Sequence, residues 1–249
     1  MKEHIMSRLQ GKTAVVTGGG TGIGFGAAKR FIDEGAFVYI FARRQEQLDA
    51  AVTKLGSQAR AVRGSVTDLS DLDRLYETVR KERGTLDVLF ANAGTGLFAP
   101  LGEITVEHYD HIFDVNVKGL VFTVQKALPL MTKGASIILT GSSTGVMGTP
   151  QFSIYSATKA AIRNLARSWA QDLRGTGIRV NVLSPGPTKT ELALEIVGEE
   201  AFDALGSSTP IGRVGDPSET GAVAAFLASS DSSFMTGGEV FVDGGLAQV

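Results

Sequence analysis

The sequence predicts an α/β fold, a doubly wound sheet of about seven parallel strands with helices on both faces. Short runs rich in β-branched and aromatic residues alternate with longer helical patterns along the whole chain, as is typical of βαβ units. The strand-like runs are apolar at successive positions, as expected where helices cover both faces of a sheet. No linker or repeat interrupts the 249 residues, so we expect a single domain over residues 1–249.

The predicted strands are short and mostly apolar: Thr13–Thr17, Phe37–Phe41, Arg60–Gly64, Leu86–Ala91, Ser136–Thr140, Arg179–Leu183 and Glu239–Val242. The predicted helices lie between them: Gly22–Glu34, Gln45–Leu55, Asp71–Glu82, Val106–Met131, Ser153–Leu173 and Ser218–Ala228. Residues 1–8 precede the first strand, and we expect them to form an N-terminal extension.

One long connection breaks this alternation. Residues Lys189–Ile211 follow the sixth predicted strand and carry a short helical piece around Leu192–Leu205. Long excursions at the carboxyl ends of parallel strands are where such folds place lids and pockets. We therefore expect residues 188–213 to form a substrate-binding loop or lid.

Composition excludes several classes of function. The formal charge of −2 and an isoelectric point near 6.0 give no bulk attraction to nucleic acid or to an anionic membrane. The chain has no cysteine, so it has no disulfide, no thiolate nucleophile and no cysteine-ligated zinc. Residues 1–6 lack the apolar core of a signal peptide, and no run approaches the ~18 apolar residues of a membrane span. We expect a cytoplasmic protein.

A glycine-rich turn follows the first predicted strand and opens the first helix. Glycines at this position allow a tight turn and let backbone N–H groups and the helix N-terminus approach a pyrophosphate, as in a Rossmann-like dinucleotide site. The spacing is Gly-x3-Gly-x-Gly rather than the common Gly-x-Gly-x-x-Gly. The residues expected to contact a dinucleotide here are Gly18, Gly20, Thr21, Gly22, Ile23 and Gly24.

The end of the second predicted strand indicates which dinucleotide binds. An acidic residue about 20 positions beyond the glycines would bind the ribose 2′-hydroxyl of NAD, whereas a basic residue accommodates the 2′-phosphate of NADP. No acidic residue lies between Ile40 and Gln45, and Arg43 and Arg44 stand there instead. Because an arginine fork can donate two hydrogen bonds to a phosphate, the sequence predicts NADP(H) as the cofactor.

Three of the four tyrosines have a basic residue four positions later: Tyr39, Tyr76 and Tyr155. Such pairs are common on helix surfaces and carry little meaning alone. Only Tyr155, which is paired with Lys159, also has a serine, Ser142, upstream at the expected carboxyl end of a strand. A phenol, a cation and a hydroxyl are the groups needed to move a proton on and off an alcohol oxygen.

With these residues in place, the chain resembles a classical short-chain dehydrogenase/reductase from about Gly11 to Gly245. The motifs that carry the resemblance are, in chain order, Thr17–Gly24, Ala91–Gly94 with alanine in place of the first asparagine, Asn116, Ser142, Tyr155–Lys159, Pro185–Gly186 and Val242–Gly245. More narrowly, the sequence resembles bacterial NADP-dependent ketoreductases that act on secondary alcohols.

The resemblance implies a hydride transfer between nicotinamide and a ketone or secondary alcohol. It implies that Tyr155 is the general acid/base, that Lys159 lowers its pKa and binds the nicotinamide ribose, that Ser142 polarises the carbonyl, and that Asn116 holds a relay water. Bringing a phenol from a pKa of ~10 to ~7 requires about 4 kcal/mol of phenolate stabilisation. It also implies a homotetramer. The further cofactor contacts expected are Asn92, Ala93, Gly94, Tyr155, Lys159, Pro185 and Gly186.

Two positions depart from the family pattern. Ser65 stands where an acidic residue is frequent near the adenine, so we expect the adenine to contact the Ser65 hydroxyl and the Val66 backbone. Thr188 stands where an aliphatic residue is usual, beside the expected nicotinamide carboxamide. The apolar residues that flank the candidate site favour an apolar or aromatic ketone over a sugar: Leu97, Phe98, Val146, Met147, Phe152, Leu192 and Ile196.

The sequence is compatible with four other interpretations to different degrees. Gly141–Gly145 matches the nucleophile elbow of α/β-hydrolases, but that fold needs a histidine after the serine, and His4, His108 and His111 all precede it. The i,i+3 pair His108 and His111 lacks further ligands, so no metal site is expected. A non-catalytic NADP(H)-sensing protein would tend to lose the catalytic groups, which are all present. A 3-oxoacyl-carrier-protein reductase would need a basic docking patch, for which the sequence offers only Lys133 and Arg174.

Overall fold

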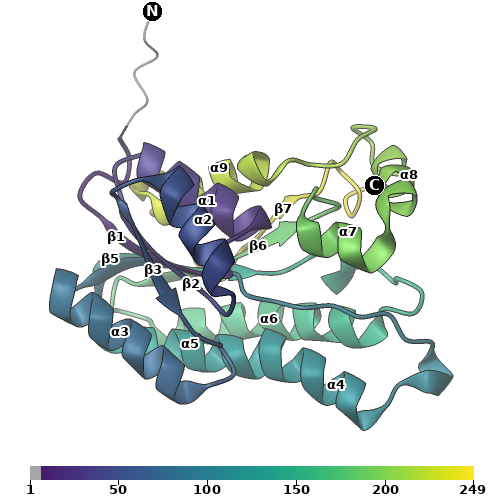
Figure 1. Cartoon of the computed structure of the whole chain (residues 1–249), viewed down its shortest axis with the longest axis horizontal. Helices are drawn as coiled ribbons and strands as arrows, with labels where there is room; N and C mark the ends of the chain where they lie inside the picture. Colours follow the sequence, from purple (N-terminus) through teal and green to yellow (C-terminus); the bar gives the residue numbers. More distant parts are fainter. Residues whose placement is uncertain (1–6) are drawn as a thin grey trace, which may run out of the picture.

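The computed structural model describes residues 7–249 and has the predicted α/β architecture (Figure 1). Seven strands form one sheet in the order β3-β2-β1-β4-β5-β6-β7, and every neighbouring pair is parallel. The strands are β1 Thr13–Thr17, β2 Phe37–Ala42, β3 Ala59–Arg63, β4 Leu86–Ala91, β5 Met131–Thr140, β6 Arg179–Pro185 and β7 Glu239–Val242.

Helices cover both faces of the sheet (Figure 1). One face carries α1 Gly22–Asp33, α2 Gln45–Leu55 and α9 Pro217–Ala228. The other face carries α3 Leu69–Arg83, α4 Val106–Phe113, α5 Gly119–Ala127 and α6 Ser153–Asp172. Two short helices, α7 Glu191–Val197 and α8 Glu199–Ser207, lie together at one end of the molecule beside the C-terminus. None of the described helices is long and apolar enough to span a bilayer.

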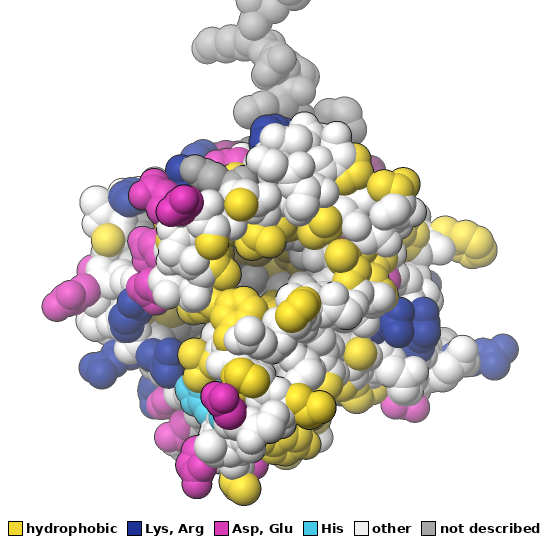
Figure 2. All heavy atoms as spheres, turned by 90° about the vertical axis from the view of Figure 1, so that its right-hand side faces the viewer, with side chains coloured by type: hydrophobic (Ala, Val, Ile, Leu, Met, Phe, Trp, Pro, Cys, Tyr) yellow, Lys and Arg dark blue, Asp and Glu magenta, His cyan; other side chains and the backbone are white. Residues whose placement is uncertain are grey.

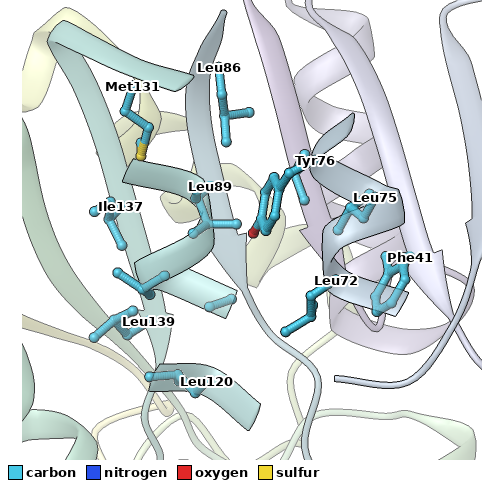
Figure 3. Packing of buried hydrophobic residues seen from close by; sticks show 14 of the residues in the cluster. Phe41, Leu72, Leu75, Tyr76, Leu86, Leu89, Leu120, Met131, Ile137 and Leu139 are labelled. Carbon is cyan, nitrogen blue, oxygen red and sulfur yellow. The ribbon is translucent and has the colours of Figure 1, made fainter. Parts of the chain in front are cut away.

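Each face of the sheet has its own hydrophobic core. On the α3, α5 and α6 face, Leu72, Leu75 and Tyr76 of α3 meet Leu89 of β4 (Figure 3). On the opposite face, α1 and α9 approach so closely that a Cβ on Gly221 would lie 2.7 Å from the Gly26 carbonyl oxygen. The sheet is therefore held between two packed layers, which fixes the carboxyl ends of the strands relative to one another.

Polar caps fix where several helices begin. The Asp68 side chain accepts hydrogen bonds from the backbone of Ser70 and Asp71, which satisfies free N–H groups at the start of α3. At the start of α9, Asp216 and Glu219 form a reciprocal capping box around Pro217. These local signals explain why α3 and α9 begin within about two residues of their predicted positions.

Two predicted helices are wrong in their extent. The single helix predicted over Val106–Met131 is interrupted by a π-helical segment at Asp114–Lys118, and Met131 already belongs to β5. An amphipathic pattern continues through a π turn, so the sequence did not reveal the break. The helical piece around Leu192–Leu205 is two helices, because Gly198 between them adopts a φ of +76°.

The predicted N-terminal extension falls mostly outside the described residues, since the description begins at Ser7. Arg8 is described, and its guanidinium forms ion pairs with Glu34 after α1 and with Asp231. Leu9 is fully buried in the core. The chain is therefore tied to the α1 side of the sheet before β1 begins.

Candidate active site

β1 and β4 are neighbours in the middle of the sheet. From β1 the chain adds β2 and β3 toward one edge, and from β4 it adds β5, β6 and β7 toward the other edge, so the winding direction reverses between β1 and β4. In open α/β sheets, ligands bind in the crevice at the carboxyl ends of the strands where this reversal occurs. A cavity of about 810 Å³ lies there. Figure 2 views the end of the molecule that carries α7 and α8, where hydrophobic side chains surround a central hollow.

The glycine-rich turn lies between β1 and α1 as predicted. Gly18, Gly20, Thr21, Gly22 and Ile23 all line the cavity. Gly24 does not line it, because it is buried where α1 crosses the turn, and a Cβ there would lie 2.2 Å from the Gly18 carbonyl oxygen. The sequence therefore placed the turn correctly, but Gly24 serves the contact between α1 and the turn rather than the cavity surface.

Arg43 and Arg44 lie exposed at the end of β2 and line one end of the cavity. The sequence did not single out the two residues that support them. Arg63, at the end of β3, donates from Nε to the Arg43 carbonyl oxygen at 3.2 Å. Arg74 in turn donates to the Arg63 carbonyl oxygen at 2.6 Å. These bonds fix the backbone that presents Arg43.

Ser65 and Val66 follow β3 and line the same end of the cavity. The Ser65 hydroxyl lies 2.8 Å from the Thr67 hydroxyl, and the Ser65 backbone N–H donates to Asp71 of α3 at 2.8 Å. Val66 is buried. The Ser65 hydroxyl is thus already engaged locally, while its backbone position is set by the start of α3.

The segment after β4 is bound to the end of β1. The backbone N–H groups of Asn92 and Ala93 both donate to the Thr17 hydroxyl at 3.0 Å, and the Asn92 amide donates to the Thr17 carbonyl oxygen at 3.0 Å. Asn92, Ala93 and Gly94 all line the cavity. The two strand ends that border the chain reversal therefore form one rigid edge.

The segment after β6 forms another wall. Pro185, Gly186 and Thr188 line the cavity. The Thr188 hydroxyl donates to the Gly186 carbonyl oxygen at 3.0 Å and is almost fully buried. Its polar atom therefore stabilises the local turn, which explains why a hydroxyl is tolerated at this position.

Ser142, Tyr155 and Lys159 meet at the cavity. Ser142 follows β5, whereas Tyr155 and Lys159 lie one turn apart on α6, and all three line the cavity. The Lys159 ammonium lies 5.3 Å from the centre of the Tyr155 ring and donates to the Thr140 carbonyl oxygen at 2.9 Å. The structure thus brings together three of the four residues predicted to be catalytic.

Burial dominates the electrostatics of these groups. It raises the pKa of the Tyr155 phenol, and hydrogen bonding with the Ser142 side chain opposes this rise. Burial also lowers the pKa of Lys159 to about 8. The pKa of Tyr155 is raised overall, because desolvation of the phenolate outweighs the hydrogen bonding with Ser142.

Asn116 occupies the π-helical segment and is buried behind the cavity, which it does not line. Its amide accepts from the Thr95 backbone N–H at 2.8 Å and donates to the Thr95 carbonyl oxygen at 2.8 Å. It also donates to the Thr158 hydroxyl at 3.1 Å. The Asn116 side chain therefore ties the segment after β4 to α6, which carries Tyr155 and Lys159.

An aromatic stack continues from Tyr155 into the wider part of the cavity. The Phe152 ring stacks on Tyr155 at 4.3 Å between centres, and the Phe98 ring stacks on Phe152 at 4.4 Å. Of the predicted lining residues, Phe98, Met147, Phe152, Leu192 and Ile196 line the cavity, whereas Leu97 and Val146 do not. Glu195, Phe202 and Leu205 also line the cavity and fall within the predicted loop 188–213, whereas the sequence did not single out His111 and Leu246.

Comparison with known proteins agrees with this arrangement. A family model described as enoyl-(acyl carrier protein) reductase matches residues 18–247. The oxidoreductase asL5 of Sarocladium schorii is 63% identical, over 98% of this chain and 99% of its own length. The 3-oxoacyl-[acyl-carrier-protein] reductase FabG of Thermotoga maritima is 36% identical, over 96% of this chain and 99% of its own. An NADP-dependent (R)-specific alcohol dehydrogenase of Lentilactobacillus kefiri is 34% identical, over 96% and 97%.

Solved structures agree as well. A dehydrogenase/reductase from Sinorhizobium meliloti superposes with a TM-score of 0.92 at 32% identity, over 98% of this chain and 99% of that one. A variant of a Serratia marcescens short-chain dehydrogenase/reductase superposes with a TM-score of 0.91 at 30% identity, over 96% and 99%. The shared fold, the glycine-rich turn and the Ser-Tyr-Lys cluster at one cavity therefore place this chain in the short-chain dehydrogenase/reductase family of oxidoreductases.

Proposed function

We propose that this protein is an NADP(H)-dependent oxidoreductase that transfers a hydride between the nicotinamide and a ketone or secondary alcohol. The observation that carries this proposal is that one cavity is lined at one end by Arg43 and Arg44 and elsewhere by Ser142, Tyr155 and Lys159. A dinucleotide-binding turn and a proton-transfer cluster on the same strand edge are the two halves that such a reaction needs.

The residues present fit a dinucleotide. The turn between Gly18 and Ile23 opens α1, so its backbone N–H groups suit a pyrophosphate. The positive charges of Arg43 and Arg44 suit a 2′-phosphate, and no acidic residue stands beside them on β2. We propose that Ser65, Val66, Asn92, Ala93, Gly94, Pro185, Gly186 and Thr188 provide the remaining contacts. Bound NADPH would supply the hydride.

Tyr155 acts as the proton donor to the carbonyl oxygen in this proposal, and Ser142 holds that oxygen by a hydrogen bond. Burial raises the pKa of Tyr155, so the phenol stays protonated at neutral pH, which is the form needed for reduction. Lys159 bears a positive charge below its pKa of about 8 and lies beside the Tyr155 ring, where it would stabilise a phenolate once the proton has left. Asn116 keeps α6 in register with the segment after β4.

The cavity wall favours an apolar or aromatic ketone. Phe98 and Phe152 present stacked rings next to Tyr155, and Leu192 and Ile196 of α7 cover the opposite wall. Residues 188–213 would act as a lid. The Gln47 amide of α2 donates to Glu191 at the start of α7 at 3.2 Å, so α7 already reaches across the cofactor side of the cavity.

A second candidate is a 3-oxoacyl-carrier-protein reductase. The relative from Thermotoga maritima favours it, because 36% identity over nearly the whole chain joins the two proteins. An acidic carrier needs basic residues for docking, and Lys133 is exposed at the opposite end of β5 from Ser142. Comparing kcat/KM for an acyl-carrier thioester with kcat/KM for an aryl ketone decides between the two.

The test of the proposed function is an initial-rate screen of carbonyl compounds with NADPH and NADH side by side. We expect NADPH to be consumed faster, and higher kcat/KM with NADH would overturn the cofactor assignment. Replacing Arg43 with Ala should reduce the ratio of kcat/KM for NADPH to that for NADH by about tenfold or more, the value of a charge-assisted hydrogen bond. Arg80→Ala on α3 is the matched control, since Arg80 is exposed and does not line the cavity.

We also propose a cytoplasmic homotetramer, on the family resemblance. The mass of the purified protein in solution, measured by light scattering after size exclusion, tests the oligomeric state directly.

A further inference from the structure

Thr144 is placed to determine which way the Ser142 hydroxyl points. Both residues line the cavity, and Ser142 caps the short 3-10 helix Ser143–Gly145. The Thr144 backbone N–H donates to the Ser142 Oγ at 3.2 Å, and the Thr144 Oγ1 donates to the same oxygen at 3.0 Å. Ser142 is 8% exposed, so this oxygen is held in a largely desolvated setting.

A serine hydroxyl has two acceptor positions and one hydrogen to donate. The two bonds from Thr144 occupy both acceptor positions of the Ser142 oxygen. The only hydrogen-bonding capacity left to Ser142 is therefore donation. An oxygen that accepts two hydrogen bonds is also polarised, which makes its own hydrogen a stronger donor.

Donation is what the site requires from Ser142. A ketone oxygen offers only lone pairs, and so does the phenolate that Tyr155 becomes after it has given up its proton. A serine free to accept would instead bond to the protonated phenol and hold it away from the substrate. Ser142 lies close enough to Tyr155 to interact with its phenol, and this interaction favours the phenolate form.

We propose that Thr144 is a positioning residue, whose hydroxyl restricts Ser142 to donating its one hydrogen, either to the substrate carbonyl oxygen or to the Tyr155 oxygen. This inference rests on the proposed carbonyl reduction. Thr144 touches neither reacting atom in this account and acts only through Ser142. The backbone N–H bond to Ser142 is common to any residue at position 144, so the specific contribution belongs to the threonine hydroxyl.

The test uses Thr144→Val, which removes the hydroxyl at nearly constant shape, and Thr144→Ser, which restores it. We expect Thr144→Val to lower kcat for ketone reduction about five- to tenfold, the value of one hydrogen bond, with the KM for NADPH unchanged. Thr144→Ser should recover most of the loss. Thr78→Val on α3 is the matched control, because its hydroxyl bonds the Arg74 carbonyl oxygen away from the cavity.

A second measurement needs no turnover. Ionisation of Tyr155, followed by ultraviolet difference absorbance against a Tyr155→Phe protein, should shift to higher pH in Thr144→Val, because the phenolate loses part of its donor. Unchanged kcat and an unchanged titration in Thr144→Val would overturn the inference. So would a loss of kcat that comes with a raised KM for NADPH and is not recovered by Thr144→Ser, since that pattern belongs to a disturbed turn. If the wild-type protein reduces no carbonyl compound, the proposed function is wrong. The effect of Thr144→Val on the Tyr155 titration would then still test whether Thr144 orients Ser142.

Discussion

Tyr76 and Tyr155 are both helical tyrosines with a basic residue one helical turn later, yet they lie in very different surroundings. Tyr76 points from α3 into the core toward Leu89, and its hydroxyl donates to the Thr123 carbonyl oxygen at 2.7 Å (Figure 3). Tyr155 lines the cavity beside Ser142 and Lys159. Burial raises the pKa of both phenols. A raised pKa alone therefore does not distinguish a structural phenol from a reactive one. The distinguishing features are access to a cavity and a cation that shares the same desolvated space.

The basic partners differ in the same way. Arg80 is exposed to solvent, whereas Lys159 is 4% exposed and donates to the Thr140 carbonyl oxygen. A charge in water is strongly screened from a neighbouring phenol, whereas a buried charge is not. The Lys159 charge is therefore less screened from Tyr155 than the Arg80 charge is from Tyr76.

Removing each tyrosine hydroxyl in turn is the strongest test of the difference between Tyr155 and Tyr76. Tyr155→Phe should lower kcat for carbonyl reduction by about 10³-fold, within the range of general acid–base catalysis, while NADPH still binds. Tyr76→Phe should leave kcat within about twofold of wild type, because its hydroxyl meets only a backbone carbonyl in the core. Steady-state rates and NADPH fluorescence titration measure both. Equal losses in the two variants would show that the cavity does not distinguish the tyrosines.

The pH dependence of the unfolding free energy tests the difference between the buried Lys159 and the exposed Arg80. Burial lowers the pKa of Lys159 from 10.5 to about 8, so between these values the unfolded chain binds more protons than the folded one. The contribution of Lys159 to the free energy of unfolding therefore rises as the pH increases from about 8 to 10.5. Relative to Lys159→Met, the wild-type protein should gain roughly 2 kcal/mol of unfolding free energy between pH 7 and pH 10.

Urea unfolding at several pH values measures this difference, and the shared tyrosines cancel between the two proteins. Arg80→Met is the control, because Arg80 is exposed and lies away from the cavity, and it should give a curve parallel to wild type. A parallel curve for Lys159→Met would mean that the Lys159 ammonium is solvated.

The smallest expected effect concerns stability at neutral pH. Tyr76→Phe should lower the unfolding free energy by about 1 kcal/mol, the usual value of one buried hydrogen bond. Tyr155→Phe should cost less than half of that, because water in the cavity can take the place of the hydroxyl. Denaturant midpoints at constant slope measure both, and a larger loss in Tyr155→Phe would reverse the assignment of structural and reactive tyrosine.

The residues of the cavity edge could be predicted because their signals are local. The turn at Gly18–Ile23, the pair Arg43 and Arg44, and Tyr155 with Lys159 each depend on spacing within a few positions of the chain. The parallel sheet with helices on both faces was predicted from the alternation of strands and helices, whereas the strand order came from the structure.

What the sequence did not reveal depends on contacts between distant segments. The Asn116 side chain bonds Thr95 and Thr158, which lie 21 and 42 positions away, and the sequence did not indicate these contacts. Arg63 supports Arg43 from the neighbouring strand, and Leu246 reaches the cavity from the end of the chain. The sequence did not indicate Thr144 for a different reason. Its proposed role depends on the direction of one hydrogen bond to Ser142, and residue spacing does not predict that direction.

The clearance around the glycine-rich turn indicates where mutagenic libraries can begin. A Cβ at Gly24 would lie 2.2 Å from the Gly18 carbonyl oxygen, and a Cβ at Gly18 would lie 2.9 Å from the Asn92 side-chain nitrogen, so both positions are closed to larger residues. At Gly20 the nearest atom is the Gln47 Cβ, at 3.7 Å, which is ordinary contact. Saturating this one codon should therefore yield mostly folded variants, each with a new side chain between the turn and α2. Such variants can be screened for a changed cofactor preference without first repairing the fold.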